Sequence, residues 1–157
     1  MPLLSLAKLL DRTAPPSEER RARWRRRCQL WSEAGILPTV TPRTKEGGRK
    51  RRLYREDTIW LAAVLLRVSD YIVDTNVLAG LSRDIQRTSK GRSAFARWWR
   101  DVMLGNRSAY MFYSSTEMKI LLGSTLDQFT PYLLDETAVI LDLTEVFAVV
   151  RENAAQD

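Results

Sequence analysis

Residues 18–34 carry two patterns that one helix must satisfy at once. Trp24, Cys28 and Trp31 are spaced i, i+4 and i+7, so on a helix they share one face that suits burial. At roughly 100° per residue, the arginines between them point away from that face or flank it. We therefore predict a helix with a packed side and a cationic side. Its outward or flanking cations are Arg20, Arg23, Arg25, Arg26 and Arg27.

Both ends of this helix carry boundary signals. Pro15 and Pro16 interrupt any preceding helix, because proline restricts the residue before it and cannot continue a helical ladder. Ser17 is a good N-cap, and two glutamates follow it where the helix dipole favours acids. Gly35 suits the residue that terminates the helix.

A basic hairpin is predicted directly after the helix. Residues 36–40 favour a strand, Gly47 and Gly48 supply a turn, and residues 49–54 favour the returning strand. Such a hairpin has the form of a wing. Its basic residues are Arg43, Lys45, Arg49, Lys50, Arg51 and Arg52.

The remaining segments predict an α+β fold that is mainly helical. We expect an N-terminal winged helix-turn-helix domain over residues 1–87 and a mixed α/β region over residues 93–157. Predicted helices cover 4–10, 56–71, 74–87, 93–104, 125–134 and 143–153, and predicted strands cover 110–113 and 137–141.

The excess of positive over negative charge lies in one segment. Residues 12–55 hold 14 Lys or Arg against four Glu, a local net charge of +10, whereas residues 56–157 have a net charge of −4. The whole chain carries +6. A concentrated cationic segment suits a polyanion, because each Lys or Arg that neutralises a phosphate releases a condensed counterion.

Several other function classes are disfavoured. The absence of histidine removes the commonest general base and metal ligand, and there is no Gly-rich phosphate loop, so we expect no enzyme, cofactor or metal. We interpret Cys28 and the Trp98–Trp99 pair as packing residues.

The longest apolar stretch, near residues 59–66, is too short to span a bilayer, and residues 1–10 lack the features of a signal peptide. A cytoplasmic location is expected, on the nucleoid if the source is bacterial.

Two separated motifs resemble the MerR family of DNA-binding regulators. Residues 31–38 (WSEAGILP) resemble the end of that family's recognition helix and its Gly-Leu-Leu-Pro-like exit. Residues 52–57 (RLYRED) resemble its Arg-x-Tyr-x-x-Asp after the wing, and residues 6–10 are similar to its first helix. The resemblance covers residues 4–70 and implies a recognition helix in the major groove with a wing on the flanking backbone.

The chain departs from that family at the expected contact residues. Gln29-Leu30-Trp31 stands where the family has Arg-Tyr-Tyr, so a phosphate-contacting arginine and one tyrosine are missing. Residues 25–27, one turn earlier, are inferred to replace them. The dimerising coiled coil and the metal-binding cysteines of metal-sensing relatives are absent, so a sensor function does not carry over and the effector is unknown.

The sequence thus predicts a transcriptional regulator that binds double-stranded DNA as a homodimer through residues 137–150. Two alternatives stay open: an architectural accessory factor, such as an excisionase-like or partition protein, and a non-enzymatic adaptor whose arginines dock an acidic partner. The predicted DNA-binding residues are Ser17, Arg20, Arg21, Arg23, Arg25, Arg26, Arg27, Arg43, Lys45, Arg49, Lys50, Arg51, Arg52 and Tyr54.

Overall fold

A computed structural model describes residues 3–13, 17–40, 52–72, 74–88, 93–114, 119–132 and 138–156. These residues form a mainly helical α+β structure with small antiparallel sheets, which confirms the predicted class. The elements, in chain order, are β1 (Leu3–Leu4), α1 (Leu6–Thr13), α2 (Glu18–Glu33), β2 (Tyr54–Arg55), α3 (Thr58–Val68), α4 (Thr75–Thr88), α5 (Ala94–Leu104), β3 (Tyr110–Ser114), β4 (Lys119–Gly123), the 3-10 helix η1 (Leu126–Tyr132), β5 (Ala138–Asp142) and α6 (Leu143–Ala154).

Helix α2 begins and ends where the sequence signals place it. The Ser17 hydroxyl accepts a hydrogen bond from the Arg20 amide, which satisfies one of the free donors of the first turn. At the other end Gly35 has φ 72°, a left-handed conformation that side chains other than glycine's strain. The predicted helix over residues 18–34 is therefore confirmed to within one residue.

The predicted strand over residues 36–40 is wrong for all but its last residue. The amides of Ile36 and Leu37 both donate to the Trp31 carbonyl, at 2.8 and 3.1 Å, so they close the end of α2 instead of joining a sheet. The Ser82 hydroxyl of α4 holds the Ile36 carbonyl, and both apolar side chains are buried. Val40 alone is bridged to another strand residue.

The short strand β1, which was not predicted, pairs with the base of the predicted wing, that is, with the segment from Arg52 to Arg55. Val40 and Leu53 exchange backbone hydrogen bonds of 2.7 and 3.0 Å. Next to this bridge, β2 pairs antiparallel with β1, which consists of residues 3 and 4 and precedes the first helix. Of the predicted returning strand over residues 49–54, the described part has a bridge at Leu53 and a strand residue at Tyr54, whose partner is Leu4 near the N-terminus.

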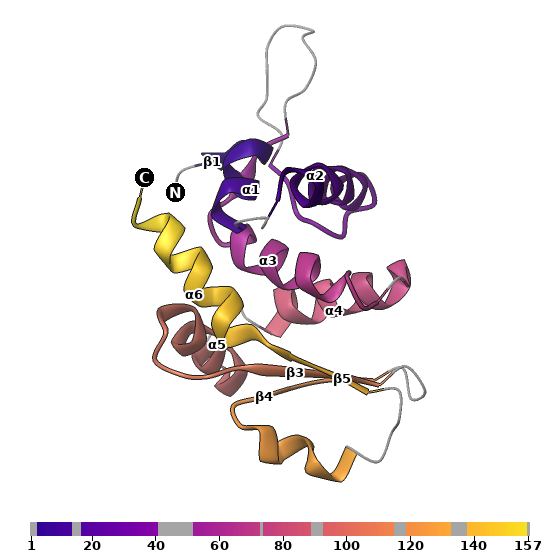
Figure 1. Ribbon diagram of the computed structural model, residues 1–157, viewed down its shortest axis with the longest axis vertical. Helices are drawn as coiled ribbons and strands as arrows, with labels where there is room; N and C mark the ends of the chain where they lie inside the picture. The colour runs from indigo at the N-terminus through magenta and orange to yellow at the C-terminus, as the bar shows by residue number, and fades with distance from the viewer. Residues whose placement is uncertain are drawn as a thin grey trace, which may run out of the picture.

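Helix α3 lies at the centre of the molecule (Figure 1). Nearly all of its side chains are buried, as its continuous apolar run predicts, and it contacts α1, α2, α4 and α6. The helix predicted over residues 56–71 is shorter in the structure and spans Thr58–Val68. Asp57 makes no capping hydrogen bond, and its carboxylate lies 3.6 Å from the Arg55 guanidinium instead.

The C-terminal segment forms a three-stranded antiparallel sheet of order β4-β3-β5, which lies at the opposite end of the molecule from α2 (Figure 1). Strand β4 was not predicted. The segment predicted as a helix over 125–134 is a 3-10 helix that contains Pro131. Its Phe129 stacks on Phe112 of β3, with ring centroids 5.7 Å apart.

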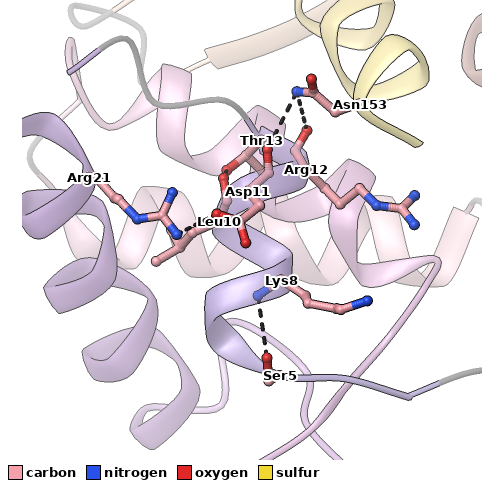
Figure 2. Close-up of polar contacts among 8 residues, drawn as sticks. All are labelled: Ser5, Lys8, Leu10, Asp11, Arg12, Thr13, Arg21 and Asn153. Atoms are coloured by element: carbon pink, nitrogen blue, oxygen red, sulfur yellow. Dashed lines mark hydrogen bonds and ion pairs between the residues drawn. The ribbon is translucent and has the colours of Figure 1, made fainter. Parts of the chain in front are cut away.

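Helix α6 joins the two halves of the chain into one core. A single hydrophobic cluster contains Trp24 of α2 as well as Phe147 of α6. The Phe147 ring meets Trp60 of α3 and Trp99 of α5 edge to face, each at 5.3 Å. Asn153 donates its amide to the backbone carbonyls of residues 11 and 12 at the end of α1 (Figure 2).

This packing uses part of the predicted dimer surface, residues 137–150, within the chain itself. Leu143, Phe147 and Val150 are almost fully buried against the chain's own helices. The apolar face of α6 is therefore filled within one chain, and the homodimer stays a prediction.

Candidate nucleic-acid interface

Helix α2 has the two-sided character that its sequence predicts. Trp24, Cys28 and Trp31 are buried against α1 and α3. The opposite side faces away from the core in the upper part of Figure 1. The exposed residues of that side are Ala22, Arg23, Arg25, Arg26, Gln29, Leu30 and Glu33.

Two of the predicted contact arginines also hold the fold together. The Arg21 guanidinium pairs with the Asp11 carboxylate of α1 (Figure 2). The Arg27 Nη1 atom donates to Ser69 Oγ at 2.7 Å and lies 2.9 Å from Asp70 Oδ1, at the end of α3. Both guanidinium groups thus have a carboxylate partner within the chain, and their contact with DNA stays a prediction.

Three other arginines of α2 are exposed. Arg23 lies 3.3 Å from Glu19 one turn earlier, and both side chains are more than half exposed, so water screens this pair strongly. Arg25 and Arg26 form no ion pair with any described residue. Arg20 is half-buried, and Ser17 is exposed but uses its hydroxyl to cap the helix.

The base of the predicted wing is attached to α2 at two points. Arg52 Nη1 lies 3.1 Å from Glu33 Oε1 in the last turn of α2. The Tyr54 hydroxyl lies 3.0 Å from Ser32 Oγ, which in turn donates to the Cys28 carbonyl. The five remaining predicted wing contacts lie outside the described residues: Arg43, Lys45, Arg49, Lys50 and Arg51.

Tyr54 must be removed from the predicted contact residues. Its side chain is 1% exposed and belongs to the core. Burial raises the pKa of its phenol, so the hydroxyl stays protonated and available to Ser32. Its place in the fold is to join the wing base to α2.

Gln29 and Leu30 were treated in the sequence only as missing contacts, yet the structure exposes both. Leu30 is 56% exposed, which is unusual for a leucine on a helix with a well-filled core face. The spacing of the buried stripe could have identified them, because 100° steps from Trp24 and Cys28 place both on the outer side. An amide and an apolar side chain thus lie one turn beyond Arg26.

Two buried polar groups of α2 are the Cys28 thiol and Trp24 Nε1, and the Trp24 Nε1 atom has no hydrogen-bond partner among the described residues. Burial raises the pKa of the Cys28 thiol to about 12, so it stays protonated at physiological pH. The Arg67 guanidinium lies 5.5 Å from the centre of the Trp24 ring. Among the described residues no group of three or more potential ligands could hold a metal ion.

Comparison with known proteins assigns the chain to no family. No family model matches it, and no curated protein is similar to it. In the described part of the chain, no helix is both long and apolar enough to cross a bilayer.

Proposed function

We propose that this protein binds double-stranded DNA, with α2 in the major groove and the basic segment at residues 41–52 on the adjacent backbone. One observation carries the proposal. Helix α2 buries Trp24, Cys28 and Trp31 and turns Arg23, Arg25 and Arg26 outward. A helix fits the major groove, and an arginine there can bind phosphate or guanine through two hydrogen bonds.

The charge balance of α2 favours a polyanion over a merely solvated face. Where an arginine serves the fold, the chain supplies a carboxylate, as Asp11 does for Arg21 and Asp70 does for Arg27. Arg25 and Arg26 have no such carboxylate among the described residues. Their uncompensated charge is what phosphate contacts require.

The outer face of α2 also offers groups that read bases. Gln29 can present its amide to both the N6 and N7 atoms of adenine, and Leu30 can contact the methyl group of thymine. These side chains follow Arg26 on the same face. We propose that they give sequence specificity, so that the protein acts as a transcriptional regulator.

Selection of bound sequences from a pool of random duplexes tests this specificity. The wild-type protein is expected to enrich a defined motif that contains A·T pairs. The Gln29→Ala and Leu30→Ala variants should each relax the preference at one position, at a cost of about 1–3 kcal/mol per lost contact. A pool that is not enriched would contradict sequence-specific binding.

Competition distinguishes DNA binding from docking to an acidic protein partner. Unlabelled duplex should displace a labelled duplex fully, whereas poly-glutamate at equal charge should not. Equal displacement by the polypeptide would favour the adaptor, because charge alone would then account for binding.

A further inference from the structure

A cavity of about 400 Å³ lies between the base of the predicted wing and the C-terminal helices. Its walls come from residues 38–40, the start of α3, the last turn of α4 and the helix α5. We infer that this cavity is a binding site for a small, planar, uncharged aromatic compound that carries hydrogen-bonding groups.

The inner wall of the cavity is apolar. Leu61, Ile85 and Trp99 line it, and each is less than 5% exposed. Met103 adds a thioether, a flexible side chain that adapts to flat aromatic ligands and contacts ring edges favourably. A volume of about 400 Å³ falls in the range of about 300–1,000 Å³ that is usual for sites of organic ligands. It accommodates a fused-ring molecule.

Polar groups also line the cavity. Arg55 and Asp57 both line it and lie 3.6 Å apart, so their charges offset each other. The Gln86 amide adds a donor and an acceptor, although one of its protons is given to Ser82 Oγ at 2.9 Å. Because the lining holds one cation and one anion, it has no net charge, which favours a ligand that has none either. An uncharged aromatic ligand with donors and acceptors suits both the apolar and the polar residues of the lining.

The cavity also adjoins the wing base directly. Val40 lines it and exchanges backbone hydrogen bonds with Leu53, so these two residues flank the basic segment at residues 41–52. On its other side the cavity reaches α5, which packs on α6. The ligand would thus contact both halves of the chain. This inference goes beyond DNA binding and holds whether or not the protein binds DNA.

Two blocking variants and one matched control test the site. Gln86→Trp and Thr39→Trp each place a large ring in the cavity, one from α4 and the other from the segment before the basic residues. Arg83→Trp places the same ring on α4 outside this cavity, at an exposed position, and serves as the control. The probe is a mixture of fluorinated aromatic fragments, observed by ¹⁹F NMR with the full-length protein.

We expect the ¹⁹F signals of uncharged fused-ring fragments to broaden when the wild-type protein or Arg83→Trp is added. Either blocking variant should remove most of this broadening. In the wild-type ¹H–¹⁵N spectrum the same fragments should shift the amides of Thr39, Gln86 and Met103, a measurement that needs no variant. The inference is overturned if no fragment binds, if the shifts cluster elsewhere, or if only charged fragments bind.

Discussion

At the scale of single residues, neighbouring arginines on α2 perform different tasks. Arg27 spans two acceptors at the end of α3, whereas Arg25 and Arg26 face away from the fold. The sequence could not separate them, because the partners Ser69 and Asp70 lie about forty residues further along the chain.

Removal of the Arg27 guanidinium should destabilise the fold. Arg27→Ala loses two hydrogen bonds and leaves Asp70 without this cation, which should lower the free energy of unfolding by about 1–2 kcal/mol after allowance for partial exposure. Arg25→Ala should change it by less than about 0.5 kcal/mol. Urea unfolding of both variants measures the difference, and equal values would contradict the assignment of Arg27 to the fold.

The buried thiol of Cys28 should be unreactive in the folded protein. Its pKa of about 12 lies above the ordinary value of 9.0, so the folded state keeps the proton when the unfolded chain would lose it. The thiol therefore favours folding below pH 9, and this contribution is lost as the pH rises from 9 towards 12. Iodoacetamide at neutral pH should label the protein only after denaturant is added. Rapid labelling of the native state would show that the thiol is accessible.

At the scale of elements, the sequence predicted most helices and also the strands β3 and β5, which lie within one residue of their predicted ranges, but it missed β1 and β4. Caps and periodic apolar residues are local signals, so α2, α5 and α6 lie within a few residues of their predicted ranges. The β1–β2 pair joins residues fifty positions apart, and no local pattern reveals such a partner. The strand assigned to residues 36–40 failed because its first amides are used to close α2.

Two glycines should respond to alanine in opposite ways. Gly35 has φ 72°, and a methyl group there would meet no atom within 4 Å, so the cost of Gly35→Ala is backbone strain of about 1 kcal/mol. Gly80 lies inside α4 in equally open space, so Gly80→Ala should raise stability by about 0.5–1 kcal/mol. Thermal unfolding of the two variants is the measurement. A shift of the same sign for both would contradict the assigned ends of α2 or α4.

At the scale of the whole molecule, two sequence-derived domains share one hydrophobic cluster. The cluster joins Trp24 and Leu65 of the N-terminal part to Trp99 and Phe147 of the C-terminal part. The sequence shows that both parts contain enough apolar residues to form a core. It does not show that α6 returns to pack on α1 and α3. The candidate site was predictable to the extent that it lies on one helix. Its links to other elements, at Arg21, Arg27 and Tyr54, were not.

A shared core should unfold as one unit. Phe147→Ala removes a fully buried ring between Trp60 and Trp99 and should cost about 3–5 kcal/mol. Far-ultraviolet circular dichroism and tryptophan fluorescence should report the same single transition in urea for the wild type and the variant. The exposed Leu104 supplies the control, as Leu104→Ala. Two separate unfolding transitions in urea, of which Phe147→Ala shifts only one, would mean that the two halves of the chain unfold independently.

The salt dependence of duplex binding tests the central claim most directly. The Arg25→Ala/Arg26→Ala double variant and the wing variant Arg51→Ala are compared with Arg97→Ala, which removes an exposed cation from α5. Each phosphate contact contributes about 0.9 to the slope of log affinity against log salt concentration. If α2 contacts phosphates, the slope should fall by about two for the double variant and by about one for Arg51→Ala, while Arg97→Ala keeps the wild-type slope. Unchanged affinity and slope in the double variant would contradict the placement of α2 against DNA.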